Sequence, residues 1–191
     1  MSTADAVLDF WFGAAGTPGH GQRRAVWFRR DDAFDDLIRT RFLSLHARAA
    51  AGDLPGWHAA PRSLLALVIV LDQFSRNLFR GQPQAFASDA QALAAALHML
   101  ARGWDALLSP LERCFVYLPL EHAEDLAMQE RAVELFAALD GDAQVGDMPA
   151  WARRHHAVIA RFGRFPHRNA VLGRVSSPAE LAFLAQPGSR F

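Results

Sequence analysis

The sequence predicts an all-α fold in which seven or eight helices form an orthogonal or solenoid-like array. The composition is dominated by Ala, Leu, Arg and Glu, which favour helices. Apolar residues recur at helical spacing, and no alternating stretch followed by a hairpin turn indicates a strand. The 191 residues, of which 51% are hydrophobic, suit one domain, residues 1–191, with a sizeable core.

The first two helices are predicted from their terminal signals. One covers roughly residues 3–12, with Thr3 or Ser2 as its cap and Gly13 as its stop. A glycine-rich loop follows, and a long helix then covers roughly residues 32–51. Residues at helical spacing form the buried face expected for this long helix: Phe34, Leu37, Ile38, Phe42 and Leu45.

A helix from about Pro61 to Phe79 is expected to be the central, most buried element. Proline suits its first turn. Ile69 and Val70 extend the apolar content around the helix, beyond a single stripe. The stripe itself consists of Leu64, Leu67, Val68, Leu71, Phe74 and Leu78.

The second half of the chain is expected to be helical as well. Proline or serine opens each longer helix, and Pro119 is expected to bend the longest one because it has no amide hydrogen to donate. The expected helices cover about residues 88–102, 110–139 and 149–162, a short stretch near Ala170, and residues 178–184.

Charge and apolar run length exclude two kinds of partner. The net charge is +0 and the pI is near 7.1, whereas nucleic-acid binding requires a clear basic excess. The most apolar run, Leu64–Leu71, is far too short to span a membrane. The N-terminus shows no signal-peptide pattern, so the expected location is the cytoplasm.

Two residue types limit the possible chemistry. All 20 basic residues are arginine, which excludes Schiff-base chemistry, pyridoxal phosphate attachment and a P-loop, because each requires a lysine. The single cysteine, Cys114, excludes an internal disulfide and a CxxC site. No cofactor is predicted.

The end of the central helix carries a polar stripe. At 100° per residue, its five polar side chains fit within an arc of about 140°. One interpretation is a site. The alternative is a solvated helix end with an ordinary i,i+4 ion pair. The five residues are Asp72, Gln73, Arg76, Asn77 and Arg80.

The expected 110–139 helix carries a second polar face. Tyr117, Glu121 and Asp125 are spaced i, i+4, i+8, and His122 stands one turn before Asp125. A carboxylate beside an imidazole fixes its tautomer and raises its pKa, which suits a general acid or base. His122 and Asp125 are therefore the candidate catalytic pair. The alternative is a structural histidine with satisfied hydrogen bonds.

A metal site is an alternative use of the same residues. Glu121, His122 and Asp125 are possible ligands, and three further histidines lie downstream. A di-iron helical bundle, however, uses Glu-x-x-His twice, and here the order is His-x-x-Asp with no second copy. No metal ligand is predicted.

A third polar block lies between residues 161 and 174. Its arginines alternate with Phe162 and Phe165, which a solvated charge run does not require. A core helix, in turn, does not require the polar residues Arg164, His167, Arg168 and Asn169. This mixture indicates the wall of a pocket. The candidate binding residues in it are His167, Arg168 and Asn169.

Five segments of the chain resemble an uncharacterised bacterial family, the domain of unknown function 924. They read DFWFG from Asp9, WFRRDDAFDDLI from Trp27, LDQFSRNLFRG from Leu71, FVYLPLEHAED from Phe115 and RFGRFPHRNAVLGR from Arg161. The resemblance implies an all-helical fold similar to tetratricopeptide-repeat superhelices and no established activity. No 34-residue repeat is present in this chain. The family's blocks carry the polar residues named above, together with Glu124.

Three hypotheses follow for the function. In the first, a pocket binds a small anionic molecule and acts on it if His122 and Asp125 move a proton. Arg76, Arg80 and Arg168 would bind its carboxylate or phosphate. Asn77 and Asn169 would orient the molecule. The remaining candidate binding residues are Asp72, Gln73, Tyr117, Glu121 and His167.

The other two hypotheses need no small ligand. A tetratricopeptide-like scaffold would bind a protein or peptide on a concave face. A closed ion-pair network would be purely structural. We expect Arg76 or Asn77 to lie within one ligand's reach of His122 and of His167 or Arg168, because isolated buried charges are costly.

Overall fold

The computed structural model describes residues 3–189, and within that range it contains helices and no strand. The all-α prediction is therefore confirmed. Short 3₁₀ turns connect several of the helices. The α-helices are α1 (Ala4–Phe12), α2 (Asp32–Ala50), α3 (Pro61–Ile69), α4 (Ser75–Leu78), α5 (Asp89–Ala101), α6 (Pro110–Glu121), α7 (Leu126–Ala137), α8 (Met148–Phe162) and α9 (Pro178–Leu184).

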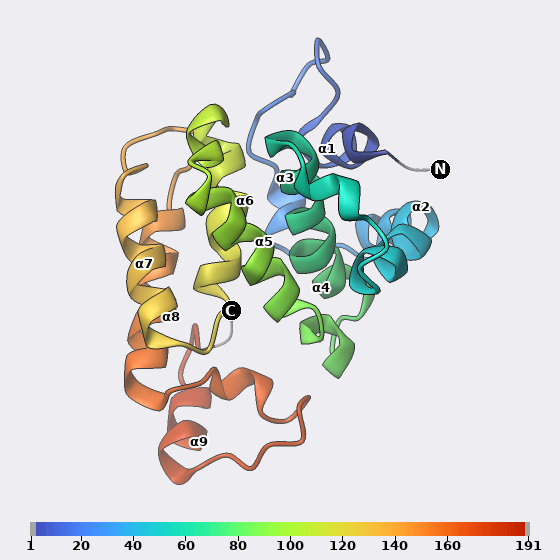
Figure 1. Cartoon of the computed structure of the whole chain (residues 1–191). Coiled ribbons are helices and arrows are strands. Elements are labelled where there is room, and N and C mark those ends of the chain that lie inside the picture. The colour runs from blue at the N-terminus through green and yellow to red at the C-terminus, as the bar shows by residue number, and fades with distance from the viewer. Residues whose placement is uncertain (1–2, 190–191) are drawn as a thin grey trace.

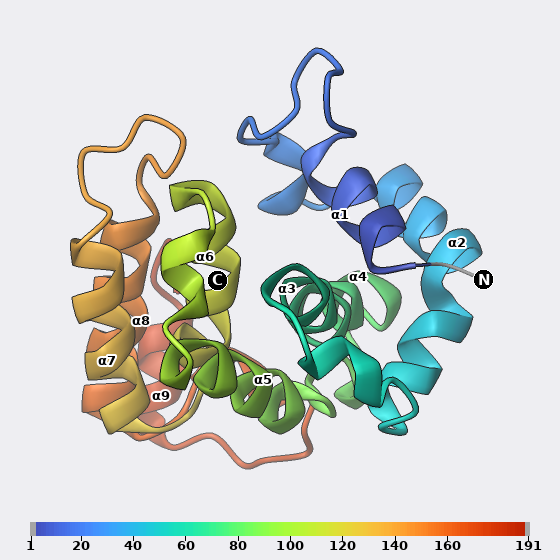
Figure 2. The same cartoon turned by 45° about the horizontal axis from the view of Figure 1, so that its top comes forward.

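Helix α3 lies at the centre of the helical array (Figures 1 and 2). It packs against α1 on one side and against α5 and α6 on the other. Helices α7 and α8 pack against each other beyond α6, and α9 lies near the end of α8 (Figure 1). None of the helices in the described part of the chain has the length and apolarity needed to cross a bilayer.

The core forms around α3, as its composition predicts. Every residue from Leu64 to Ile69 is buried. Rings of Trp11, Trp27 and Phe115 pack beside it, with centroids 4.9 to 5.7 Å apart. The helix is central because it is apolar on all sides.

The buried face of α2 is shifted around the helix relative to the expected one. Leu37, predicted to be buried, is 52% exposed. Asp35 is buried instead, because its carboxylate accepts hydrogen bonds from Asn77 and Arg80. The cap at the start of α1 is Thr3, whose side chain accepts a hydrogen bond from the amide of Ala6; Ser2 lies outside the described residues.

The central helix contains a π-helical turn at Val70–Phe74, between α3 and α4. The hydroxyl of Ser75 donates to the carbonyl of Leu71 at 2.6 Å. A π turn adds a residue to the helical period, so positions on either side of it no longer follow a constant 100° step. Side chains before and after this turn therefore face different neighbours.

Two of the expected C-terminal helices differ from the structure. The predicted 110–139 helix is two helices, because α6 ends at Glu121 and Asp125 caps α7 by accepting from the amide of Met128 at 3.0 Å. Pro119 lies inside α6, which ends soon after it. The stretch near Ala170 is a 3₁₀ turn at Pro166–Arg168 followed by turns, with the amide of Arg174 donating to the carbonyl of Asn169.

Candidate functional site

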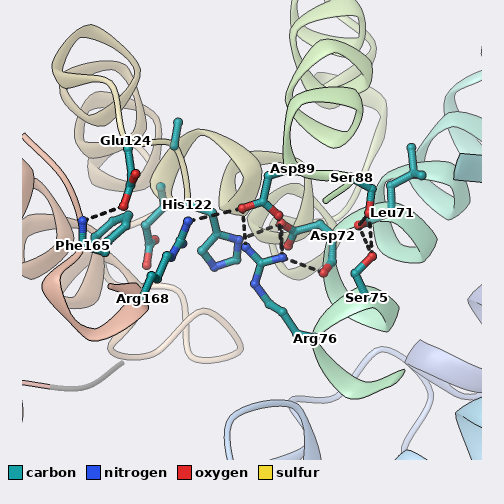
Figure 3. Close-up of polar contacts among 12 residues, drawn as sticks. Leu71, Asp72, Ser75, Arg76, Ser88, Asp89, His122, Glu124, Phe165 and Arg168 are labelled. Atoms are coloured by element: carbon teal, nitrogen blue, oxygen red, sulfur yellow. Dashed lines mark hydrogen bonds and ion pairs between the residues drawn. The ribbon is translucent and has the colours of Figure 1, made fainter. Parts of the chain in front are cut away.

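Asp72 is the centre of the polar cluster, and it is only 1% exposed. Its Oδ1 lies 2.8 Å from Nδ1 of His122 and 3.2 Å from Nη1 of Arg76 (Figure 3). Nε2 of Gln73 donates to its Oδ2 at 2.5 Å. Burial alone would raise the pKa of Asp72. Arg76, His122 and Gln73 outweigh burial and hold this pKa well below its usual range. The carboxylate is therefore ionised at neutral pH.

The ionised Asp72 fixes the tautomer of His122. A carboxylate without a proton can only accept, so Nδ1 of His122 carries the hydrogen and Nε2 keeps its lone pair. Burial, and then the charge of Arg76, lower the pKa of His122 below its ordinary value. A neutral imidazole in this state can accept a proton at Nε2.

A second carboxylate, Asp89 at the start of α5, joins two guanidinium groups. Arg76 binds it through both oxygens, at 3.0 and 3.2 Å. Arg168 approaches the same carboxylate at 3.3 Å (Figure 3). The predicted convergence of Arg76, His122 and Arg168 is therefore seen, and Asp89 and Asp72 are the groups that produce it.

Arg168 is 6% exposed and lies between two rings. Its guanidinium carbon is 4.7 Å from the ring centroid of Phe86 and 4.5 Å from that of Phe165. Within the described residues its Nε has no hydrogen-bond partner. Burial, and then Arg76, lower the pKa of Arg168 to about 10, which still leaves it charged at neutral pH.

A cavity of about 420 Å³ opens beside this cluster. Its polar lining includes His122, Asp89 and Arg168, and most of the remaining lining is apolar. A mostly apolar hollow with a few convergent polar groups is the usual form of a small-molecule site. The residues that line it are Pro83, Phe86, Ala87, Asp89, Ala90, Leu93, Pro119, His122, Ala123, Glu124, Asp125, Arg168 and Leu172.

Asn77 and Arg80 belong to a different cluster. Nδ2 of Asn77 donates to Asp35 at 2.7 Å, and Arg80 binds the same carboxylate at 2.9 and 3.0 Å. The predicted arc of five polar residues is therefore wrong. It assumed one regular helix, whereas a π turn precedes Asn77 and α4 ends before Arg80.

The expected pairing of His122 with Asp125 is also wrong. Asp125 caps α7, and His122 lies just beyond the end of α6, where it meets Asp72. The constant helical spacing that placed the two on one face stops at Glu121. Asp125 lines the cavity all the same.

Tyr117 and Glu121 lie outside the cavity lining. The hydroxyl of Tyr117 donates to Asp105 at 2.8 Å and accepts from Arg113 at 2.9 Å. Glu121 is buried with its Oε1 2.9 Å from Nδ1 of His155, whose ring centroid is 6.3 Å from that of His122. These contacts give Tyr117 a structural role and place Glu121 behind His122.

His167 and Asn169 flank Arg168 without lining the cavity. Burial, and then the charge of Arg168, lower the pKa of His167 to about 3. Asn169 is fully buried, and its Nδ2 donates to the hydroxyl of Ser176 at 3.0 Å. These two residues shape the segment that presents Arg168.

Sequence reasoning missed Asp89 as a site residue. Its position just after Ser88 reads as an ordinary acidic first-turn residue of a helix. Glu124, which only the family resemblance indicated, binds Arg174 at 2.6 and 2.9 Å and accepts from the amide of Phe165 at 2.8 Å. Glu124 thus fastens the segment that carries Arg168 to the start of α7.

Other clusters offer less. Residues 3–189 contain no group of three or more His, Cys, Asp or Glu side chains able to hold a metal ion. A second hollow, of about 430 Å³, is lined by Arg23, Arg24 and Arg41. Arg23 already binds Asp147, and Arg24 already donates to the carbonyls of Phe10 and Trp11 at the end of α1.

Comparisons with known proteins place the chain among proteins without an assigned role. The family model described as "Bacterial protein of unknown function (DUF924)" matches residues 7–188. The solved structure of a protein of unknown function from Agrobacterium tumefaciens is similar, with a TM-score of 0.85 and 40% identity. The match covers 95% of this chain and 96% of that one. No curated protein matches.

Proposed function

Since the chain belongs to the bacterial DUF924 family, whose function is unknown, its role must be inferred from its own site, and we propose that the cavity binds a small anionic molecule. His122 is the group that exchanges a proton with this molecule. The family match confirms the resemblance of the sequence motifs. The observation that carries the proposal is that His122, held by Asp72, and the buried Arg168 both line one cavity.

The chemistry assigns a different task to each side chain. Arg168 binds the acid group, because a buried guanidinium offers directed donors to an anion. His122 takes up a proton at Nε2, and Asp72 holds the ring and stabilises the imidazolium that forms. Arg76 binds both Asp72 and Asp89, so it positions the two carboxylates and is not itself part of the cavity lining.

A closed ion-pair network is the second candidate, and one observation favours it. Asp72, Arg76 and Asp89 satisfy one another, with two positive and two negative charges once Arg168 is included. This network accounts for Arg76. It leaves unexplained why Arg168 and His122 border a cavity with a mostly apolar wall. A hollow of this size suits a small molecule better than a peptide.

A thermal-shift series with inorganic phosphate, acetate and benzoate tests the proposal. An anion that binds only the folded state raises the melting temperature. At a concentration of a hundred times its Kd it adds about 2.7 kcal/mol to the free energy of unfolding. Arg168→Met should remove the increase. The matched control is Arg161→Met, which changes an exposed arginine of α8. No increase with any anion, or equal losses in both variants, would contradict the proposal.

We also infer the setting of the protein. The net charge of +0 argues against nucleic acid as a partner, and none of the described helices could span a membrane. We expect a cytoplasmic protein. A cell fractionation with tagged protein would test the location, and recovery in the membrane pellet would contradict it.

A further inference from the structure

We propose that the ligand is a small monocarboxylic acid with an apolar body, and that its carboxylate binds at the N-terminus of α5 beside Arg168. This inference rests on the proposed function and names the ligand class for the same cavity. Four features of the described residues carry it: an uncapped helix terminus, a buried arginine, the balance of charge and the apolar wall.

The first turn of α5 has no side-chain cap. Ser88 occupies the N-cap position, but its hydroxyl donates to the carbonyl of Leu71 at 2.9 Å and lies 2.7 Å from that of Ser75. Asp89 and Ala90, in that first turn, line the cavity. The free amides of a helix start, with the positive end of its dipole, attract an anion. Helix α7 differs, because the side chain of Asp125 caps it.

Arg168 is an independent indication of an anion at the same place. It is 6% exposed, it lines the cavity, and its Nε has no hydrogen-bond partner among the described residues. Its one carboxylate partner, Asp89, is already bound through both oxygens by Arg76. Arg168 therefore brings a buried positive charge to the cavity wall, and its guanidinium can share its donors between Asp89 and a ligand carboxylate.

The charge balance favours a group with a single negative charge. Arg76 and Arg168 balance Asp72 and Asp89, and Arg174 balances Glu124. Asp125 adds one more negative charge to the cavity lining, so a ligand with the fewest charges is favoured. A carboxylate adds one charge, which one proton on His122 neutralises. A phosphate dianion would bring a second charge close to Asp89 with no group left to balance it.

The rest of the wall requires an apolar body. Phe86, Leu93, Pro119 and Leu172 line the cavity from four separate segments of the chain. Burying apolar surface against them contributes about 25 cal/mol per Å². A ligand that is an acid at one end and apolar at the other matches this arrangement.

The first experiment compares three probes that share a six-carbon chain: hexanoate, hexyl phosphate and hexylammonium. Thermal shift and amide NMR are recorded for the full chain. Hexanoate should raise the melting temperature and shift the amide signals of residues 89–91. Hexylammonium should do neither. If hexyl phosphate binds and hexanoate does not, the anion site stands and the carboxylate assignment is overturned. If no probe binds, the proposed function fails as well.

The second experiment places a charge at the site without harming the fold. Ala90→Asp adds a carboxylate to the cavity wall, in a first helical turn where acidic residues are stabilising. The matched control is Gln91→Asp, which adds the same charge to the same turn at an exposed residue outside the lining. Hexanoate affinity should fall about tenfold or more in Ala90→Asp. Equal losses in the two variants would overturn the placement on α5.

Discussion

A single buried carboxylate, Asp72, determines the state of the side chains around it. It holds the ring of His122 and accepts from Arg76 and Gln73 at once. An ionised group at 1% exposure is tolerated only because every partner is charged or strongly hydrogen-bonding. The cluster therefore has a structural half, around Arg76, and a half that faces the cavity, around His122 and Arg168.

The two halves should respond differently to mutation. Arg76→Ala leaves Asp72 buried without its main counter-charge, so it should cost about 3–5 kcal/mol of unfolding free energy. His122→Ala leaves that ion pair intact and should cost less, while ligand stabilisation is lost. Urea denaturation of both variants without ligand measures the difference. A large and equal loss in both would favour the closed-network hypothesis.

The buried histidines should make stability fall in mild acid. The pKa of His167 is lowered to about 3, from an ordinary value near 6.5. A group whose pKa is lowered by folding stabilises fully above its unfolded pKa, and this stabilisation is lost as pH falls towards the folded value. Between pH 6.5 and about 3, His167 lowers the free energy of unfolding by up to about 1.4 kcal/mol for each pH unit of acidification. Urea midpoints at pH 7.5 and 5 measure it, and His167→Gln should flatten the slope.

At the scale of elements, the break between α6 and α7 shapes the candidate site. Because α6 ends at Glu121, His122 turns towards Asp72 instead of continuing along a helix. The segment that follows, Ala123–Asp125, lines the cavity. The π turn in the central helix also redirects side chains, because Asp72 faces His122 whereas Asn77 and Arg80 face Asp35.

Asp125 should behave as a helix cap. Asp125→Ala removes the acceptor for the amide of Met128, so it should cost about 1 kcal/mol. Asp125→Ser keeps an acceptor and should restore most of that loss. Ligand stabilisation should persist in both variants, because His122 is held by Asp72. Loss of ligand binding in Asp125→Ser would restore Asp125 as a catalytic candidate.

Local pattern predicted the elements better than it predicted their contacts. Capping residues, prolines and glycines gave most helix starts and stops, and apolar content identified the central helix. The partners of the polar residues came from elsewhere: Asp35 for Arg80, Asp89 for Arg168, and Asp72 for His122 fifty residues away. Helical spacing describes one helix at a time, so it cannot say which helix packs beside it.

At the scale of the whole molecule, one large core connects α1 to α8. Leu67 on α3 is 3% exposed within this core. Leu67→Ala should cost about 2–5 kcal/mol through lost burial and the cavity that remains. The single domain of residues 1–191 stays a prediction, and it requires one unfolding transition. Two separate transitions in calorimetry of the wild type would contradict it.

The cavity joins parts of the chain that are synthesised at different times. Asp89 precedes Arg168 by 79 residues. The carboxylate of Glu124 can form its hydrogen bonds only after Phe165 and Arg174 have been synthesised. The helices around α3 can pack while the later segments are still being translated. A nascent chain stalled before Phe165 would thus lack the contacts that complete the cavity, and under the proposed function a ligand could stabilise the protein only after that segment has left the ribosome.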